Sequence, residues 1–183
     1  LVLFDRIASR EELLPLVATR PIGNLRVGAF TLDQKWSVIL GTQHVSYLTE
    51  DYLSFKFPLA IATEEVMVMK ATVLPNQSLL EALQHLELNQ RLIDSDGEWI
   101  AFKTNSQTKV EILEELNSKE FTDINYTQEY QSLQFLEDIF TYNAAQIEFD
   151  FSYVDVASFS LSEYPITILG DNYKISSSSK LSR

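Results

Sequence analysis

The stretch Glu65-Val66-Met67-Val68-Met69-Lys70 decides the fold class of this 183-residue chain. Its four central residues form an uninterrupted apolar run, which is typical of a strand that is buried on both faces. Such strands occur in parallel sheets with helices on each side. Asn76 follows shortly after and is a good N-cap for a helix over residues 77–88. A buried strand followed by a helix is the repeating unit of an α/β fold.

The segments on either side of this stretch continue the alternation of strands and helices. The chain begins with an apolar strand over residues 1–4, and a turn at Asp96-Gly97 predicts a hairpin. The remaining expected elements are a capping box at Ser9-Arg10-Glu11-Glu12 before a helix limited by Pro15, a capping box at Thr31-Leu32-Asp33-Gln34 before a helix closed by Gly41, a strand over residues 44–48, and helices over residues 110–116 and 132–142. We therefore predict one α/β domain, residues 1–164, with a mostly parallel central sheet flanked by helices.

The region after residue 145 predicts a final strand and then a boundary. Ile147, Phe149 and Phe151 alternate with Glu148 and Asp150, which favours a half-exposed strand over residues 146–151. The last residues, 165–183, contain short isoleucine-rich segments and a run of serines, which indicates a linker and the beginning of a further domain.

The composition limits which partners the chain can bind and which cellular compartment it fits. The net charge of −12 argues against nucleic acid, because a phosphate backbone requires a basic face. No apolar run approaches the roughly 20 residues of a membrane span. The absence of cysteine excludes disulfides and thiolate metal sites, and it fits a cytoplasmic protein.

Basic residues are concentrated at the start of this acidic chain. Four of the six arginines lie within the first 26 residues, at positions 6, 10, 20 and 26. Because a guanidinium can bind phosphate with two hydrogen bonds, the arginines are candidates for an anion site. The alternative is that they form surface salt bridges with Glu11, Glu12 and Asp33.

Aromatic residues and histidines offer no clear second site. Tyr47, Tyr52, Phe55 and Phe57 lie close together in the sequence, and we expect a core or domain-interface cluster rather than a base-stacking platform. The two histidines have no metal-ligand spacing.

Several segments together resemble the GlmU-like sugar nucleotidyltransferases, and the resemblance covers nearly the whole chain. The most specific part is Thr19-Arg20-Pro21-Ile22 followed by Leu25-Arg26-Val27-Gly28. The other matching segments are Leu13-Leu14-Pro15-Leu16, Lys35-Trp36, Glu65-Val66-Met67-Val68, Leu74-Pro75-Asn76, Asn89-Gln90, Ile100-Ala101-Phe102, Asp138-Ile139-Phe140, Asn143 and Ile147-Glu148-Phe149-Asp150. The resemblance implies a nucleotide-diphospho-sugar transferase fold, followed from about residue 165 by a left-handed β-helix.

The resemblance also implies an activity, which is transfer of a nucleotidyl group from a nucleoside triphosphate to a sugar 1-phosphate with Mg²⁺. Related β-helices form trimers, so a homotrimer of the longer protein is expected. On this basis Arg20 and Arg26 are the candidate catalytic residues, and Asp150 is the candidate metal ligand. The candidate substrate-binding residues are Arg6, Arg10, Lys35, Asn76 and Asn143.

The chain departs from the family pattern at two places. The family carries a glycine-rich phosphate loop after the first strand, whereas Asp5-Arg6-Ile7-Ala8-Ser9-Arg10-Glu11-Glu12 contains no glycine. The family also carries a metal-binding aspartate after the middle strand, where this chain has Met69-Lys70-Ala71-Thr72. Asp150 and Glu148 could instead hold the metal, or both could face water.

Three functions follow from these observations. The first is an active sugar nucleotidyltransferase. The second is a catalytically degenerate binding or scaffold domain attached to a β-helix sugar acyltransferase. In the third, the chemistry of the whole protein is acyl transfer within that β-helix. The fold alone cannot choose among these functions, because function depends on the site.

Overall fold

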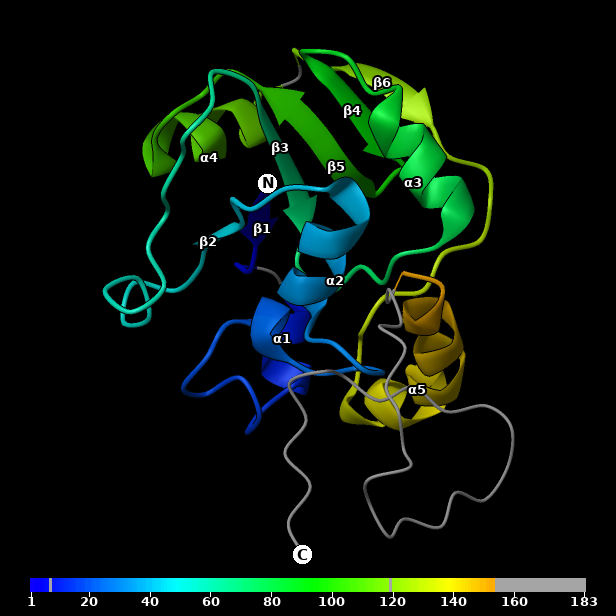
Figure 1. Ribbon diagram of the computed structural model, residues 1–183. Helices are drawn as coiled ribbons and strands as arrows, with labels where there is room; N and C mark the ends of the chain where they lie inside the picture. The colour runs from blue at the N-terminus through cyan, green and yellow to red at the C-terminus, as the bar shows by residue number, and fades with distance from the viewer. Residues whose placement is uncertain (7, 119, 154–183) are drawn as a thin grey trace, which may run out of the picture.

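The computed structural model describes residues 1–6, 8–118 and 120–153, and its centre is a six-stranded sheet of order β2-β1-β3-β5-β4-β6 (Figure 1). β1 is parallel to both β2 and β3, β4 is parallel to β6, and β5 is antiparallel to β3 and β4. Only β5 therefore runs against the other described strands, which confirms the mostly parallel sheet. The strands are β1 (Val2–Phe4), β2 (Ser46–Leu48), β3 (Val66–Lys70), β4 (Gln90–Ile93), β5 (Trp99–Thr104) and β6 (Thr122–Asn125).

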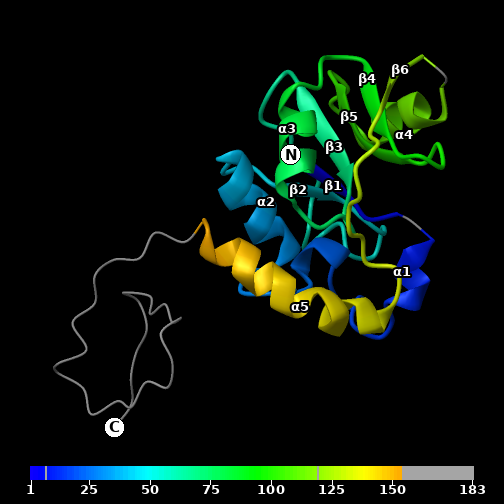
Figure 2. The same cartoon turned by 90° about the vertical axis from the view of Figure 1, so that its right-hand side faces the viewer.

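Helices cover both faces of the sheet, with α2 and α3 on one face and α4 on the other (Figure 2). The helices are α1 (Ser9–Glu12), the 3-10 turn η1 (Ile22–Asn24), α2 (Leu32–Leu40), α3 (Gln77–Gln84), α4 (Lys109–Asn117) and α5 (Leu136–Phe151). α2 begins at the predicted Thr31 capping box and ends at Gly41, which has a φ of 63°. Asn76 caps α3 by accepting from the Leu79 N–H at 2.7 Å.

The alternation of side chains along β1 and β3 explains why β1 and the first four residues of β3 are all apolar. Val66 and Val68 pack with Ile112 of α4 on one face, whereas Leu3 and Met69 pack on the other face. The second face contacts α2 and α3, whose buried residues include Trp36, Leu79 and Leu83. Full burial of each such side chain contributes about 1.5–3 kcal/mol, so the sheet is held from both sides.

The predictions for the end of the domain were wrong, because residues 146–151 continue a helix and do not form a strand. α5 runs from Leu136 to Phe151. Its buried residues are Gln146 and Asp150, four positions apart, which is a helical spacing. Ile147 and Phe151 are only half-buried, so their alternation with acidic residues was misleading. Phe140, on the same helix, is 83% exposed.

Smaller differences concern helix ends and aromatic residues. α1 has Ala8 and not Ser9 as its N-cap, and α3 ends at Gln84, earlier than predicted. Tyr47 and Phe57 do contact each other, with ring centroids 5.7 Å apart. Tyr52 and Phe55, by contrast, are 65% and 99% exposed, so the four aromatic residues form no common core cluster.

The predicted linker, residues 165–183, lies outside the described residues, so the boundary near residue 164 stays a prediction. Among the helices of the described part, none is long and apolar enough to cross a membrane.

Candidate functional site

The carboxyl ends of the parallel strands lie along one edge of the sheet. In open α/β sheets, ligands bind outside these ends, where the strand order reverses. The order reverses here between β1 and β3, because the chain passes from β1 to β2 on one side and then to β3 on the other. Asp5, Thr49 and Thr72 lie just after β1, β2 and β3, and all three are buried.

Asp5 and Arg10 form a buried ion pair at this edge. Arg10 Nη1 donates to Asp5 Oδ2 at 2.6 Å, and the Ile22 N–H donates to Asp5 Oδ1 at 3.0 Å. The Thr49 hydroxyl also donates to Asp5. Burial raises the pKa of the Asp5 carboxyl, while the hydrogen bonds from Thr49 and Ile22 and the charge of Arg10 oppose that shift. Through the bond from Thr49, Asp5 therefore fixes the segment after β1 to the end of β2.

The other nitrogen of Arg10 holds the loop that follows α1. Arg10 Nη2 donates to the Val17 carbonyl at 2.5 Å and lies 3.3 Å from the Arg20 carbonyl and 3.2 Å from the Tyr52 hydroxyl. Because the Arg10 side chain is only 9% exposed, its hydrogen bonds are made within the protein. Arg10 thus holds the end of α1 and the loop after it together.

The remaining arginines do not converge with Arg10. Arg6 pairs with Asp51 at 3.0 Å, and Lys109 pairs with the same carboxylate. Arg26 is exposed and donates to the Ala29 carbonyl, while Arg20 is exposed on the loop that Arg10 holds. The salt bridges of Arg6 and Arg10 therefore use Asp51 and Asp5, and not the predicted Glu11, Glu12 and Asp33.

A second buried ion pair joins Lys35 of α2 to Asp150 of α5. The two side chains are 0% and 1% exposed. Burial lowers the pKa of Lys35, and the hydrogen bond from Lys35 to Asp150 opposes that shift. Asp150 Oδ2 also accepts from the Ala29 N–H at 2.7 Å, and Asn143 Oδ1 accepts from the Gly28 N–H at 2.8 Å. Lys35, Asn143 and Asp150, predicted as site residues from the sequence, therefore lie together.

The carboxylates of the described residues do not fit a magnesium site. Asp150 uses one oxygen for Lys35 and the other for backbone N–H groups, and it lies on no exposed strand face. Thr72, at the family's aspartate position, is buried and accepts from the Ser132 hydroxyl at 2.8 Å. No group of three acidic or histidine side chains in the described part of the chain could hold a metal ion.

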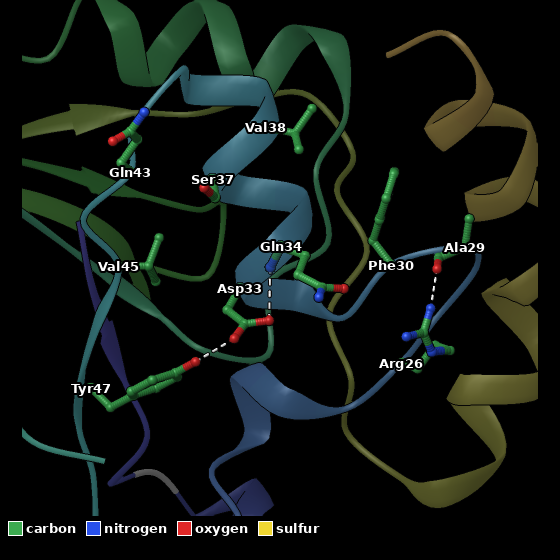
Figure 3. Close-up of a pocket in the computed structure, with 10 residues that line it drawn as sticks. All are labelled: Arg26, Ala29, Phe30, Asp33, Gln34, Ser37, Val38, Gln43, Val45 and Tyr47. Atoms are coloured by element: carbon green, nitrogen blue, oxygen red, sulfur yellow. Dashed lines mark hydrogen bonds between the residues drawn. The ribbon is translucent and has the colours of Figure 1, made fainter. Parts of the chain in front are cut away.

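A pocket of about 560 Å³ lies beside α2 and the edge strand β2 (Figure 3). Tyr47 and Asp33 hydrogen-bond across its floor, and Asn24 donates to both, at 2.7 and 2.8 Å respectively. Burial is the main cause that raises the pKa of Tyr47, with Asp33 adding to it. Figure 3 places Arg26 at the far end of the pocket, where its guanidinium points toward the Ala29 carbonyl.

Two further pockets lie beyond the carboxyl ends of β3, β4 and β6. One has a volume of about 480 Å³ and is lined by residues that include Asp94, Tyr126 and Ser132. The other has a volume of about 360 Å³ and lies between Pro75 and α5. The sequence did not single out Gln146, which lines the second pocket.

The comparisons with known proteins agree with this geometry. Residues 1–156 match the family model described as "Sugar nucleotidyl transferase". No curated protein matches the chain significantly. The match covers the whole described sheet, both buried ion pairs and every described helix. The chain therefore belongs to the sugar nucleotidyl transferase family.

Proposed function

We propose that this domain transfers a nucleotidyl group from a nucleoside triphosphate to a sugar 1-phosphate. In this reaction a sugar phosphate oxygen attacks the α-phosphorus in line, an O–P bond forms, and pyrophosphate leaves. The family match over residues 1–156 is the observation that carries the proposal. The sheet supports it, since parallel strands end together at an edge that is suited to ligands.

The exposure of the cations suggests how the roles are divided among them. Arg20 and Arg26 are exposed, so their guanidiniums are available to phosphate oxygens. Arg10 and Lys35 are buried and engaged with Asp5 and Asp150. We therefore assign phosphate binding to Arg20 and Arg26, and we assign Arg10 and Lys35 to positioning the loop that carries them.

The described residues contain no group of side chains that could hold a metal ion, and this bears on whether the nucleotide binds with its own metal. Mg²⁺ in proteins is commonly bound through substrate phosphates with only one or two carboxylates. The proposed substrate is therefore the magnesium complex of the triphosphate, which brings its metal with it. Asp150 as a direct ligand would require the ion pair with Lys35 to open.

The second candidate is a binding domain without catalysis. Two observations favour it, namely the absence of glycine between Asp5 and Glu12 and the engagement of Arg10 and Lys35 by buried carboxylates. Such a domain would bind a nucleotide or nucleotide sugar and regulate or support an acyltransferase. The GlmU-like architecture, with a β-helix after residue 165 and a homotrimer formed through it, is part of the same proposal.

Calorimetry with UTP, CTP, GTP, ATP and dTTP, each with and without Mg²⁺, tests the proposed binding step. We expect one nucleotide to bind, with Mg²⁺ dependence, and the variants Arg20→Ala and Arg26→Ala to weaken that binding at least tenfold. Arg91→Ala is the matched control, because Arg91 pairs with Asp123 on β4 and β6. Equal affinity in all three variants would remove Arg20 and Arg26 from the proposal.

A further inference from the structure

β6 forms one edge of the sheet, at the opposite side from β2 (Figure 1). All four residues of β6 are exposed, whereas each of the other described strands has at least one buried residue. The segment from Phe121 to Tyr126 contains no proline and no lysine, which are the residues that commonly protect an edge strand. An exposed edge without such protection is a template for pairing with another strand.

Two residues of β6 direct their backbone groups away from the sheet. The N–H groups of Thr122, at the start of β6, and of Tyr126, just after its end, donate to carbonyls at the two ends of β4, at 3.0 and 2.7 Å. Because alternate residues of a strand bond to the same neighbour, Ile124 also faces β4. The N–H and C=O groups of Asp123 and Asn125 therefore face outward, so β6 offers two donors and two acceptors to a further strand.

The side chains of β6 present an apolar contact and no uncompensated charge. Ile124 is 37% exposed and lies beside Leu92 of β4, which belongs to the core that includes residues of α3. Asp123 accepts two hydrogen bonds from Arg91, at 2.8 and 3.1 Å, so its charge is balanced at the edge. Although the chain has a net charge of −12, two copies can meet at this edge without opposing an unpaired carboxylate.

We propose that β6 pairs with β6 of a second copy of this chain, in antiparallel orientation about a two-fold axis at Ile124. In this register Asp123 of one copy lies opposite Asn125 of the other, and each such pair exchanges two backbone hydrogen bonds. Ile124 meets its own equivalent at the position between these pairs, where opposite side chains are closest. A register centred on Asp123 would instead oppose two carboxylates, which is destabilising.

This interface goes beyond the proposed function, and it differs from a homotrimer formed through a β-helix. The two sheets become one continuous sheet through β6, which is the kind of isologous contact that a two-fold axis requires. A second copy is the occupant that the edge favours, because the Asp-Ile-Asn sequence of β6 places a carboxylate beside an amide when it is paired with itself.

A single introduced cysteine tests the register directly, because the chain contains no cysteine of its own. In the full chain, Ile124→Cys should form a disulfide-linked dimer under mild oxidation, since the two side chains meet at the axis. Val110→Cys places a cysteine at a 62% exposed position of α4, and it should cross-link far less under the same conditions. Non-reducing gel electrophoresis measures both. Equal cross-linking of the two variants would overturn the inference.

Analytical ultracentrifugation of the full chain measures the association without a cross-link. We expect association that depends on protein concentration, and we expect Ile124→Lys and Ile124→Glu each to weaken it about tenfold or more, because like charges would be opposed at the axis. An equal mixture of these two variants should restore association, since opposite charges then meet. Val110→Lys is the matched control and should associate as the unchanged chain does.

A proline variant tests the backbone hydrogen bonds separately from the side chains. Asn125→Pro removes one outward N–H and leaves the donors to β4 in place, so it should weaken association while circular dichroism shows a folded domain. A monomer at every concentration would overturn the inference. An oligomer that Ile124→Lys, Ile124→Glu and Asn125→Pro leave unchanged would overturn it as well, because its interface would then lie elsewhere.

Discussion

Lys35 Nζ and Asp150 Oδ1 form an ion pair inside the protein, although 115 residues separate them in the sequence. The pair joins α2 to the last described helix, α5. Asp150 also accepts from the backbone N–H of Ala29, so the segment between β1 and α2 is fixed at the same point. α5 and the arginine-containing loop are therefore a single structural unit.

Breaking this pair should destabilise the domain strongly. Lys35→Met leaves Asp150 without its cation, and Asp150→Leu leaves a buried ammonium. Each change should cost about 3–5 kcal/mol, because an uncompensated buried charge remains. The double variant should cost clearly less than the sum of the two, as measured by urea unfolding. Additive losses would show that the two side chains do not interact.

Gly28 should be intolerant of a side chain. Its φ is 84°, and a Cβ at this position would lie 2.6 Å from Asp150 Oδ2 and 2.8 Å from the Gln146 carbonyl carbon. Gly97 has a similar φ of 79° and nothing within 4 Å, so Gly97→Ala is the matched control. We expect Gly97→Ala to cost about 1 kcal/mol through backbone strain and Gly28→Ala to cost at least 2 kcal/mol more, as measured by urea unfolding. Equal costs would contradict the close packing of α5 on this loop.

Asp51 should titrate below its ordinary value. The hydrogen bond and charge of Lys109, with a smaller contribution from Arg6, lower its pKa below 3.8. Because the folded value is the lower one, the stabilisation by Asp51 is fully present above pH 3.8 and is lost as the pH falls through the folded pKa. Carboxyl-carbon NMR titration measures this midpoint directly. Lys109→Gln should raise the midpoint toward 3.8, and an unchanged midpoint would remove Lys109 as the cause.

Asn76 should contribute to stability through its helix cap. Its side chain accepts from the Leu79 N–H at 2.7 Å, so Asn76→Ala should cost about 1 kcal/mol, whereas Asn76→Asp should retain most of the stability. Thermal unfolding of both variants measures this difference. If both variants bind nucleotide normally, the role of Asn76 is structural, and its assignment to substrate binding fails.

The sequence predicted most of the sheet because its strands carry local signals. The continuous apolar run of β3 and the Asp96-Gly97 turn between β4 and β5 each have one structural interpretation. The Thr31 and Gly41 signals placed the ends of α2 correctly for the same reason. Residues 146–151 had two interpretations, since apolar residues alternate there while Gln146 and Asp150 repeat at helical spacing.

The ion pairs of the candidate site could not be read from spacing. Arg10, Lys35 and Asp150 were identified as functional candidates, but the pairing of Arg10 with Asp5 and of Lys35 with Asp150 depends on how the chain folds. A buried polar residue on a helix, such as Gln146, has no sequence signal that separates it from an exposed one.

The most direct test of nucleotidyl transfer is product formation by the full chain. The protein is incubated with Mg²⁺, each nucleoside triphosphate in turn, and the 1-phosphates of glucose, galactose, mannose and N-acetylglucosamine. Pyrophosphate release and ³¹P NMR of the nucleotide sugar are the two readouts. We predict that one pair of substrates gives equal amounts of pyrophosphate and nucleotide sugar, and that Arg20→Ala reduces the rate at least tenfold. Nucleotide binding without either product, for every pair, would contradict catalysis and favour the binding domain.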